Sequence, residues 1–292
     1  MRLPAIHVTR ADALMLLTMV MWSVNISSVK VLVTVLPPLG FGVLRYALSA
    51  LVLFPLLHRH EGAVGLARGR VGWLAAAGAV GLGLNQVAFL LGIGAGLAAI
   101  LLSTTPLITS VVAALWAREP LRRRVLVSLA VSFGGSVVVI VGGNGPLAGS
   151  LVGGSLILLS ATALGLGAVL AKGALGVYSA LRVTTWMCLV CSLTLLPLGL
   201  PGLLHGPTAP VTLPVVGATA FTVLGATVLG NLFWNDAVRR MGAMRTALYT
   251  YLQPIIGVLA AIVLLGERLT MAEVFGGSVV LMGLLLALSV AH

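Results

Sequence analysis

Charged residues are scarce in this sequence. Lys, Arg, Asp and Glu make up 8% of its 292 residues, whereas 60% are hydrophobic and the mean hydropathy is +1.16. A water-soluble globular protein carries about a quarter of its residues as charged side chains. The sequence therefore excludes a soluble globule and predicts a protein whose surface faces lipid.

Residues that carry catalytic or metal chemistry are also few. Cys188 and Cys191 have the spacing of a redox pair, but they fall inside an apolar run, where two small buried side chains are expected. No acid–base pair, nucleophile or metal-binding set converges, so the sequence argues against an enzyme and implies neither a metal nor a cofactor. The five histidines are scattered between apolar runs or near the chain ends: His7, His58, His60, His205 and His292.

The hydrophobic residues form ten runs, each long enough to cross a bilayer. A bilayer core of about 30 Å needs roughly 17–25 residues of helix. Backbone groups must be paired inside a membrane and no alternation typical of a β-barrel is visible, so we predict an all-α integral membrane protein with ten transmembrane helices. The predicted spans are residues 12–33, 40–57, 71–92, 97–116, 124–142, 153–171, 180–200, 212–235, 244–264 and 270–290.

The basic residues outnumber the acidic ones, 17 against six, and invite a nucleic-acid-binding interpretation. They form no single basic face and lie in the short gaps between apolar runs, so we expect the lipid bilayer and no nucleic acid as the partner. Lys and Arg are retained on the cytoplasmic side of membranes, and their distribution places both termini in the cytoplasm. Nothing in residues 1–11 resembles a cleaved signal peptide, so the first span is expected to remain.

One pattern occurs twice. The stretch Pro106–Glu119 is an apolar run opened by proline and closed by glutamate, and Pro254–Glu267 repeats it with the same spacing. Residues 11–141 and 153–290 are therefore predicted to be two related halves. Each half has five spans, an odd number, so the second is expected to be an inverted copy of the first. In many membrane transporters, internal repeats of this kind meet near the bilayer midplane and form the substrate site there.

The first half opens with Trp22-Ser-Val-Asn25, followed by Lys30, Pro37-Pro38 and Arg45. This pattern, with the two Pro…Glu stretches, resembles the EamA-type branch of the drug/metabolite transporter superfamily. The resemblance covers essentially the whole chain and is strongest to ten-helix bacterial amino-acid exporters, including those for aromatic residues. It implies a secondary transporter, independent of ATP, in the bacterial inner (plasma) membrane.

Polar and aromatic side chains inside the spans are few, and each is costly in hydrocarbon, so they mark a candidate substrate site. They cluster in matching spans of the two halves, as expected around a pseudo-two-fold axis. Interhelical hydrogen bonding is the alternative role for any single member. The candidates are Trp22, Asn25, Asn85, Gln86, Phe89, Ser103, Thr104, Asn231, Trp234, Tyr249, Tyr251 and Gln253.

Pro106 and Pro254 each remove a backbone hydrogen bond and are predicted to be paired hinges. Routine tolerance of proline in membrane helices is the alternative.

Lys30 and Arg45 lie near the outer ends of their spans, where each can snorkel outward; attraction of a substrate carboxylate and simple anchoring are both open. The second half has Met187 at the position of Arg45, so we expect an asymmetric site.

Two functions remain open. The first is a transporter that exports amino acids by alternating access, with uncharged and aromatic ones suited to a cavity of Trp, Tyr and Asn. The second is an efflux carrier for hydrophobic drugs or other small metabolites.

Two inverted halves supply a complete pathway, so we expect a monomer. We expect the substrate gradient to drive transport, because no carboxylate falls deep in a span (Asp12, Glu61, Glu119, Asp236, Glu267 and Glu273).

Overall fold

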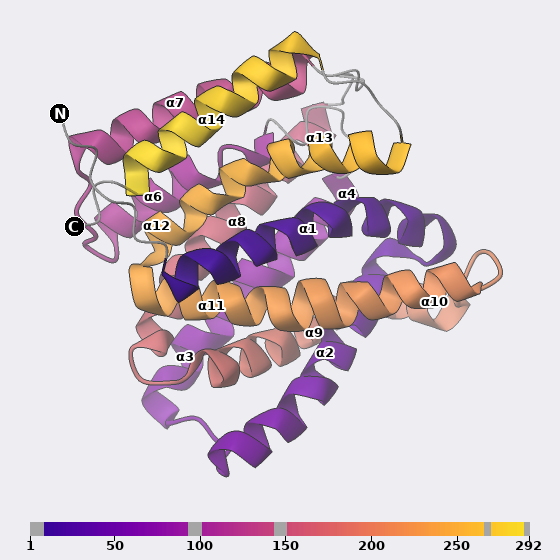
Figure 1. Cartoon of the computed structure of the whole chain (residues 1–292). Helices are drawn as coiled ribbons and strands as arrows, with labels where there is room; N and C mark the ends of the chain where they lie inside the picture. The colour runs from indigo at the N-terminus through magenta and orange to yellow at the C-terminus, as the bar shows by residue number, and fades with distance from the viewer. Residues whose placement is uncertain (1–8, 93–100, 143–150, 266–269, 289–292) are drawn as a thin grey trace.

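The computed structural model of the chain describes residues 9–92, 101–142, 151–265 and 270–288. These residues form ten helical rods, which confirms the predicted all-α class (Figure 1). Several rods consist of consecutive helical segments. The segments are α1 (Arg10–Val35), α2 (Pro38–Glu61), α3 (Arg68–Ala76), η1 (Ala77–Leu84), α4 (Asn85–Gly92), α6 (Thr105–Leu115), α7 (Arg123–Gly142), α8 (Leu151–Leu175), α9 (Ala180–His205), α10 (Leu213–Ala220), η2 (Phe221–Leu229), α11 (Gly230–Met241), α12 (Ala243–Leu248), η3 (Tyr249–Tyr251), α13 (Leu252–Leu265) and α14 (Met271–Leu288).

Local signals explain where several rods begin and end. α1 begins at a capping box, in which the side chains of Thr9 and Asp12 accept hydrogen bonds from each other's backbone N–H groups. α2 begins at Pro37-Pro38, whose fixed φ suits a first helical turn. It ends at Gly62, whose φ of 69° favours glycine. Gly242, with a φ of 85°, separates α11 from α12 in the same way.

Seven rods are long and apolar enough to cross a membrane by length and composition. The shorter α6 and α14 are also apolar. Leucine and valine side chains cover much of the outer surface; Leu51, for example, is 68% exposed and Leu115 is 80% exposed. An apolar outer surface of this extent is typical of a protein that contacts lipid, because the hydrocarbon core of a bilayer solvates apolar side chains.

Rods that hold equivalent positions in the two halves pack together: α2 lies against α9, and α7 against α14 (Figure 1). In the register of the repeated Pro…Glu stretches, Ser128 corresponds to Gly276 and Gly135 to Gly283. Gly135 approaches Gly276 so closely that an added Cβ would lie 2.8 Å from the Gly276 carbonyl oxygen. The Ser128 hydroxyl donates to the Gly283 carbonyl at 2.9 Å. Exchanging the halves exchanges these two contacts, as a pseudo-two-fold relation requires.

Two stretches of π-helix, η1 and η2, interrupt matching rods of the two halves. Each stretch ends just before a polar candidate, Asn85 after η1 and Asn231 after η2. The extra residue in a π turn rotates the side chains that follow it, and such bulges recur at functional sites. Glycine fits η1 into the bundle, since a Cβ added to Gly81 would lie 2.5 Å from the Cα of Gly167 on α8.

Candidate functional site

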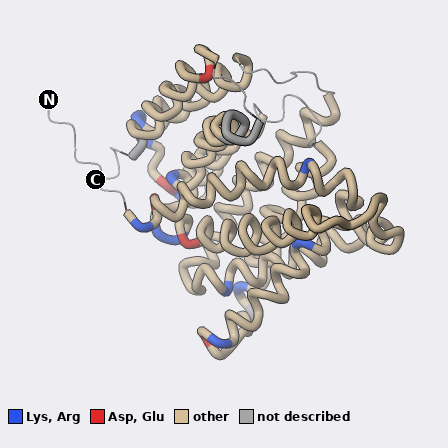
Figure 2. Tube along the Cα trace, turned by 45° about the vertical axis from the view of Figure 1, so that its right-hand side comes forward, with Lys and Arg blue, Asp and Glu red and all other residues tan. Residues whose placement is uncertain are grey.

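Most Lys, Arg, Asp and Glu residues of the described chain lie towards one end of the bundle, hereafter the basic end (Figure 2). It contains the start of α1, the end of α2, the segment after α6 and the turn between α11 and α12. Three ion pairs between described residues join the first half to the second at this end: Glu61–Arg182 (2.9 Å), Glu119–Lys172 (2.6 Å) and Asp12–Arg245 (3.1 Å). These pairs hold the two halves together at the basic end.

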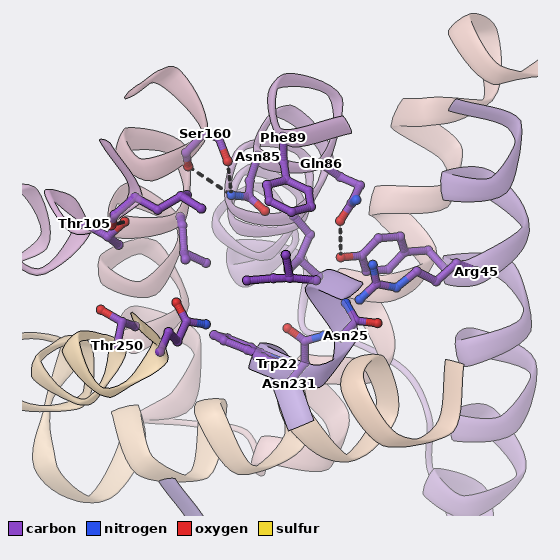
Figure 3. Close-up of a pocket in the computed structure, with 16 residues that line it drawn as sticks. Trp22, Asn25, Arg45, Asn85, Gln86, Phe89, Thr105, Ser160, Asn231 and Thr250 are labelled. Atoms are coloured by element: carbon purple, nitrogen blue, oxygen red, sulfur yellow. Dashed lines mark hydrogen bonds between the residues drawn. The ribbon is translucent and has the colours of Figure 1, made fainter. Parts of the chain in front are cut away.

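A cavity of about 110 Å³ lies between the two halves (Figure 3). Both halves supply its walls. The first half contributes α1, α2, η1, α4, α6 and Leu102 just before α6, and the second half contributes α8, α11, η3 and α13. The lining combines aliphatic side chains with amide, hydroxyl and aromatic groups and one guanidinium group. The lining residues are Trp22, Asn25, Ile26, Arg45, Tyr46, Leu82, Asn85, Gln86, Phe89, Leu102, Thr105, Ser160, Leu164, Asn231, Thr250 and Gln253.

Seven of the twelve candidates from the sequence line this cavity: Trp22, Asn25, Asn85, Gln86, Phe89, Asn231 and Gln253. Another five do not: Ser103, Thr104, Trp234, Tyr249 and Tyr251. Trp234 lies one turn beyond Asn231 and packs against Trp22, with 5.2 Å between ring centroids and 32° between the ring planes.

Hydrogen bonds direct three of the other side chains away from the lining. The Tyr249 hydroxyl donates to Asp12 near the basic end, and the Tyr251 hydroxyl donates to the Leu129 carbonyl of α7. The Thr104 hydroxyl donates to a carbonyl of the preceding turn. We found no signal in the sequence that separates these residues from the ones that line the cavity.

Arg45 is the clearest difference from the sequence interpretation. Its side chain does not reach outward as expected but is 5% exposed and lines the cavity. It lies seven residues inside α2, about 10 Å from the start of that helix. Its Nε donates to the Thr227 hydroxyl of η2, and its guanidinium lies 5.4 Å from the centre of the Tyr46 ring. The sequence signal for its role was the charge itself, inside an apolar span.

Some amide groups of the cavity are bound to neighbours, whereas others lack a partner. Asn85 Nδ2 donates to both the backbone oxygen and the hydroxyl of Ser160 at 2.9 Å, which joins the two halves. The Tyr46 hydroxyl donates to Gln86 Oε1 at 3.2 Å (Figure 3). Gln86 Nε2 and Asn25 Oδ1 are buried without a hydrogen-bond partner among the described residues. Buried polar atoms are almost always paired, so these two atoms lack the partner that burial normally requires.

The helices that carry the two prolines are interrupted just before each proline. A turn at Ser103–Thr104 precedes Pro106, and the 3₁₀ segment η3 precedes Pro254. Pro106 leaves the Leu102 carbonyl without its helical N–H donor, and the Thr105 hydroxyl donates to that carbonyl at 2.7 Å. The interruptions place Thr105 and Thr250 at the cavity wall.

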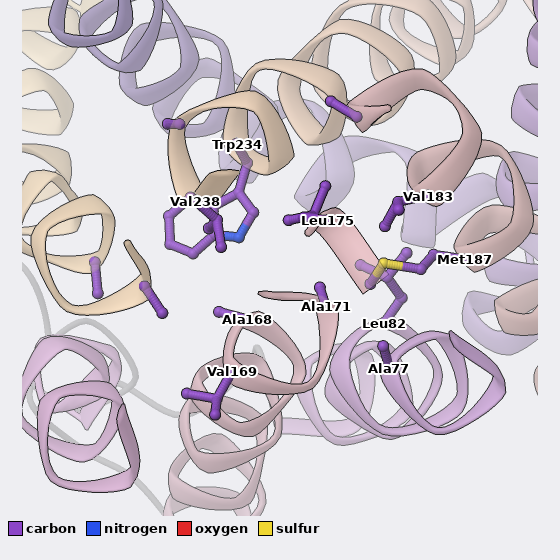
Figure 4. Close-up of a cluster of buried hydrophobic side chains, with 14 of the residues drawn as sticks. Ala77, Leu82, Ala168, Val169, Ala171, Leu175, Val183, Met187, Trp234 and Val238 are labelled. Atoms are coloured by element: carbon purple, nitrogen blue, oxygen red, sulfur yellow. The ribbon is translucent and has the colours of Figure 1, made fainter. Parts of the chain in front are cut away.

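The cavity is closed towards the basic end. On α11, Asn231 lines the cavity, and Trp234 follows one turn later. Val238, a further turn along, lines a second hollow of about 520 Å³ at the basic end, hereafter the vestibule. Trp234 is 4% exposed, and buried Ala168, Ala171 and Leu175 of α8 belong to the same hydrophobic cluster (Figure 4). Along α11, Trp234 lies between the residue that lines the cavity and the residue that lines the vestibule.

The apolar rods, the two similar halves and the polar cavity between them define an integral membrane protein of the transporter class. The chain belongs to the EamA-like transporter family, whose model matches residues 9–141 and residues 151–289. The two matches correspond to duplicated halves. The family is one of transporters, so the protein is not an enzyme.

Distant relatives cover almost the whole chain. It is 28% identical over 280 residues to a probable terminal-alkyne amino-acid exporter of Streptantibioticus cattleyicolor, covering 93% of this chain and 91% of the relative. It is 27% identical over 286 residues to a probable amino-acid metabolite efflux pump of Salmonella typhimurium, covering 93% and 92%. A crystal structure at 16% identity has a TM-score of 0.78 over 95% of this chain and 96% of that chain, which supports the fold.

Proposed function

We propose that the protein is a secondary transporter that exports amino acids, including neutral and aromatic ones, by alternating access. The observation that carries this proposal is the cavity between the halves, where an indole ring and amide groups with unpaired atoms face one another. A free amino acid needs both polar partners and an apolar surface for its side chain. The names of the Streptantibioticus and Salmonella relatives support the same substrate class.

The closed basic end supports alternating access. The three inter-half ion pairs and the cluster around Trp234 separate the cavity from the vestibule. We propose that they open when the halves move relative to each other, with Pro106 and Pro254 as hinges. Because basic residues are retained on the cytoplasmic side, this end faces the cytoplasm and both termini lie there, in a bacterial inner membrane. One monomer is sufficient in this proposal.

We also propose that the substrate gradient drives export. None of the described carboxylates lines the cavity; Asp12, Glu61 and Glu119 make ion pairs at the basic end. A proton-coupled exporter usually carries a carboxyl group within reach of its substrate.

An efflux carrier for hydrophobic drugs is the second candidate function. The observation that favours it is the apolar part of the lining, formed by Ile26, Leu82, Phe89, Leu102 and Leu164. A carrier of this kind would bind apolar cations without an amino-acid head group. The polar and apolar substrates are therefore best compared in the same assay.

Counterflow in proteoliposomes tests both functions. Vesicles preloaded with unlabelled phenylalanine are expected to take up labelled phenylalanine, and those preloaded with a hydrophobic cationic dye are not. Uptake should persist when the pH gradient is collapsed; its loss would contradict gradient-driven export. Absence of exchange for phenylalanine and threonine, with exchange of the dye, would favour the drug carrier instead.

A further inference from the structure

Arg45 is a buried cation without a carboxylate partner in the described part of the chain. The four ion pairs found there use other cations: Lys172, Arg182, Arg240 and Arg245. The Arg45 side chain reaches the cavity (Figure 3), and only its Nε makes a hydrogen bond to a described residue. Its two terminal nitrogens, which carry four N–H donors, are left for a ligand.

An unpaired guanidinium is costly at this depth. Burial of a charge costs several kcal/mol after relaxation unless a counter-ion and hydrogen bonds compensate it. Charged groups inside membrane spans are therefore rare and typical of substrate pathways. Thr227 supplies one neutral acceptor and the Tyr46 ring lies 5.4 Å from the guanidinium, but neither group carries a negative charge. An anion that entered the cavity would supply the missing negative charge.

Two neighbouring side chains fit this anion and a positive group beside it. Tyr46 holds Gln86 by its Oε1, and the other end of the amide, Nε2, is an unpaired donor. Asn25 Oδ1 is an unpaired acceptor. Gln86 is 4% exposed and Asn25 is 7% exposed. The cavity thus offers a cation, a free N–H donor and a free oxygen acceptor from α2, α4 and α1.

We propose that Arg45 and Gln86 bind the carboxylate of the substrate, and that Asn25 Oδ1 accepts a hydrogen bond from its α-ammonium group. This inference rests on the proposed export of amino acids and adds how the head group is held. The substrate side chain then lies against Trp22 and the apolar lining.

The single cation selects a carboxylate over a phosphate. A phosphate group carries up to two negative charges and is usually held by several Arg or Lys side chains. Arg45 is the one Lys or Arg among the residues that line the cavity. The vestibule at the basic end is lined by five Lys or Arg side chains and one carboxylate, Glu119, so its lining carries a net positive charge. Such a vestibule raises the local concentration of carboxylates on the path to the cavity.

Three phenyl compounds separate the head groups. Phenylalanine has both groups, 3-phenylpropionate lacks the ammonium group, and phenethylamine lacks the carboxylate. In wild-type proteoliposomes, 3-phenylpropionate is expected to compete with labelled phenylalanine, and phenethylamine is expected to compete at least tenfold more weakly. Equal competition by phenethylamine would overturn the proposal without any variant. Exchange of phenethylamine or a cationic dye, but of no amino acid, would instead refute the proposed function.

Arg45→Gln tests the residue itself. A hydrogen-bonded charge pair contributes a roughly 10- to 100-fold change in affinity, and the variant should weaken phenylalanine and 3-phenylpropionate by that factor while leaving phenethylamine unchanged. Arg45→Lys should restore part of the affinity. Arg59→Gln, an exposed cation at the end of α2, is the matched control and should bind as wild type.

Thr227→Val separates positioning from binding. It removes the acceptor of Arg45 Nε but keeps the guanidinium in the cavity, so carboxylate preference should persist at lower affinity. A folded Arg45→Gln protein that binds phenylalanine as tightly as wild type would overturn the inference and leave the proposed function intact. If Arg45→Gln does not fold, the wild-type competition series still decides.

Discussion

Trp22 belongs to the first half, yet its indole ring is held by the second. Its Nε1 donates to the Ala226 carbonyl of η2 at 3.0 Å, and its ring packs against Trp234 of α11. The close approach requires Gly230, since a Cβ there would lie 2.5 Å from Trp22 Nε1. The indole is therefore fixed at the floor of the cavity, between the substrate and the residue that closes the path to the basic end.

Trp22→Ala is expected to weaken phenylalanine exchange. Loss of an aromatic contact costs about 0.5–1.5 kcal/mol, or roughly a 2- to 13-fold rise in the half-saturating concentration measured by counterflow. Trp73→Ala is the matched control, because Trp73 pairs with Trp116 on the outer surface and both rings are more than 40% exposed. An equal effect of the two substitutions would assign Trp22 to packing.

Residues of the cavity were predicted from sequence only in part. Trp22, Asn25 and Asn85 stand out because polar groups inside an apolar span are rare. Tyr249 and Tyr251 stand out equally, but the 3₁₀ segment that carries them directs their hydroxyls to Asp12 and Leu129. Which face a residue takes after such an interruption depends on tertiary packing, which hydropathy does not contain.

At the scale of elements, the glutamate that closes the first repeated stretch has a structural role in the opposite half. Glu119 accepts hydrogen bonds from the backbone N–H groups of Ala243 and Met244, the first residues of α12, and pairs with Lys172. The residue before α12 is Gly242, which has no side chain to cap the helix. A carboxylate at this N-terminus satisfies free N–H donors and the helix dipole. The sequence predicted a helix end, but not that Glu119 caps a helix of the other half.

Glu119→Ala should destabilise the protein. Loss of the carboxylate that accepts from two backbone N–H groups and makes a partly buried ion pair is expected to cost about 1–3 kcal/mol of unfolding free energy. The melting temperature in detergent should fall accordingly. Asp236→Ala is the control, since Asp236 pairs locally with Arg240, which is 54% exposed, and such a pair contributes about 0.5 kcal/mol or less. Equal melting temperatures for the two variants would contradict this role of Glu119.

The π segments are the elements that the sequence did not reveal. η1 and η2 occupy the same place in each half and precede Asn85 and Asn231. Composition predicts a helix there, because π and α turns share nearly the same residue preferences. Gly81 of η1 lies close against Gly167 of α8, and hydropathy contains no information about such tertiary contacts.

At the scale of the whole molecule, the fold was largely predictable. The apolar runs predicted the helices. The repeated Pro…Glu stretches predicted two halves, and the family model matches the chain in two corresponding parts. The sequence did not predict which end of the cavity is closed. In the proposed alternating access, closure would depend on a small free-energy difference between two packings of the same helices, and we expect Trp234 and the inter-half ion pairs to contribute to it.

We expect the amino-acid site to lie in the cavity between the halves, and a cysteine placed in the wall of this cavity tests that expectation. Cys188 and Cys191 are fully buried, so the wild-type protein is expected to resist thiol reagents. Ile26→Cys puts a thiol in the lining, and Arg59→Cys puts one at the exposed basic end. Phenylalanine should slow modification of Ile26→Cys and leave Arg59→Cys unchanged. An Ile26→Cys protein that exchanges phenylalanine but is modified at the same rate with and without it would contradict this expectation.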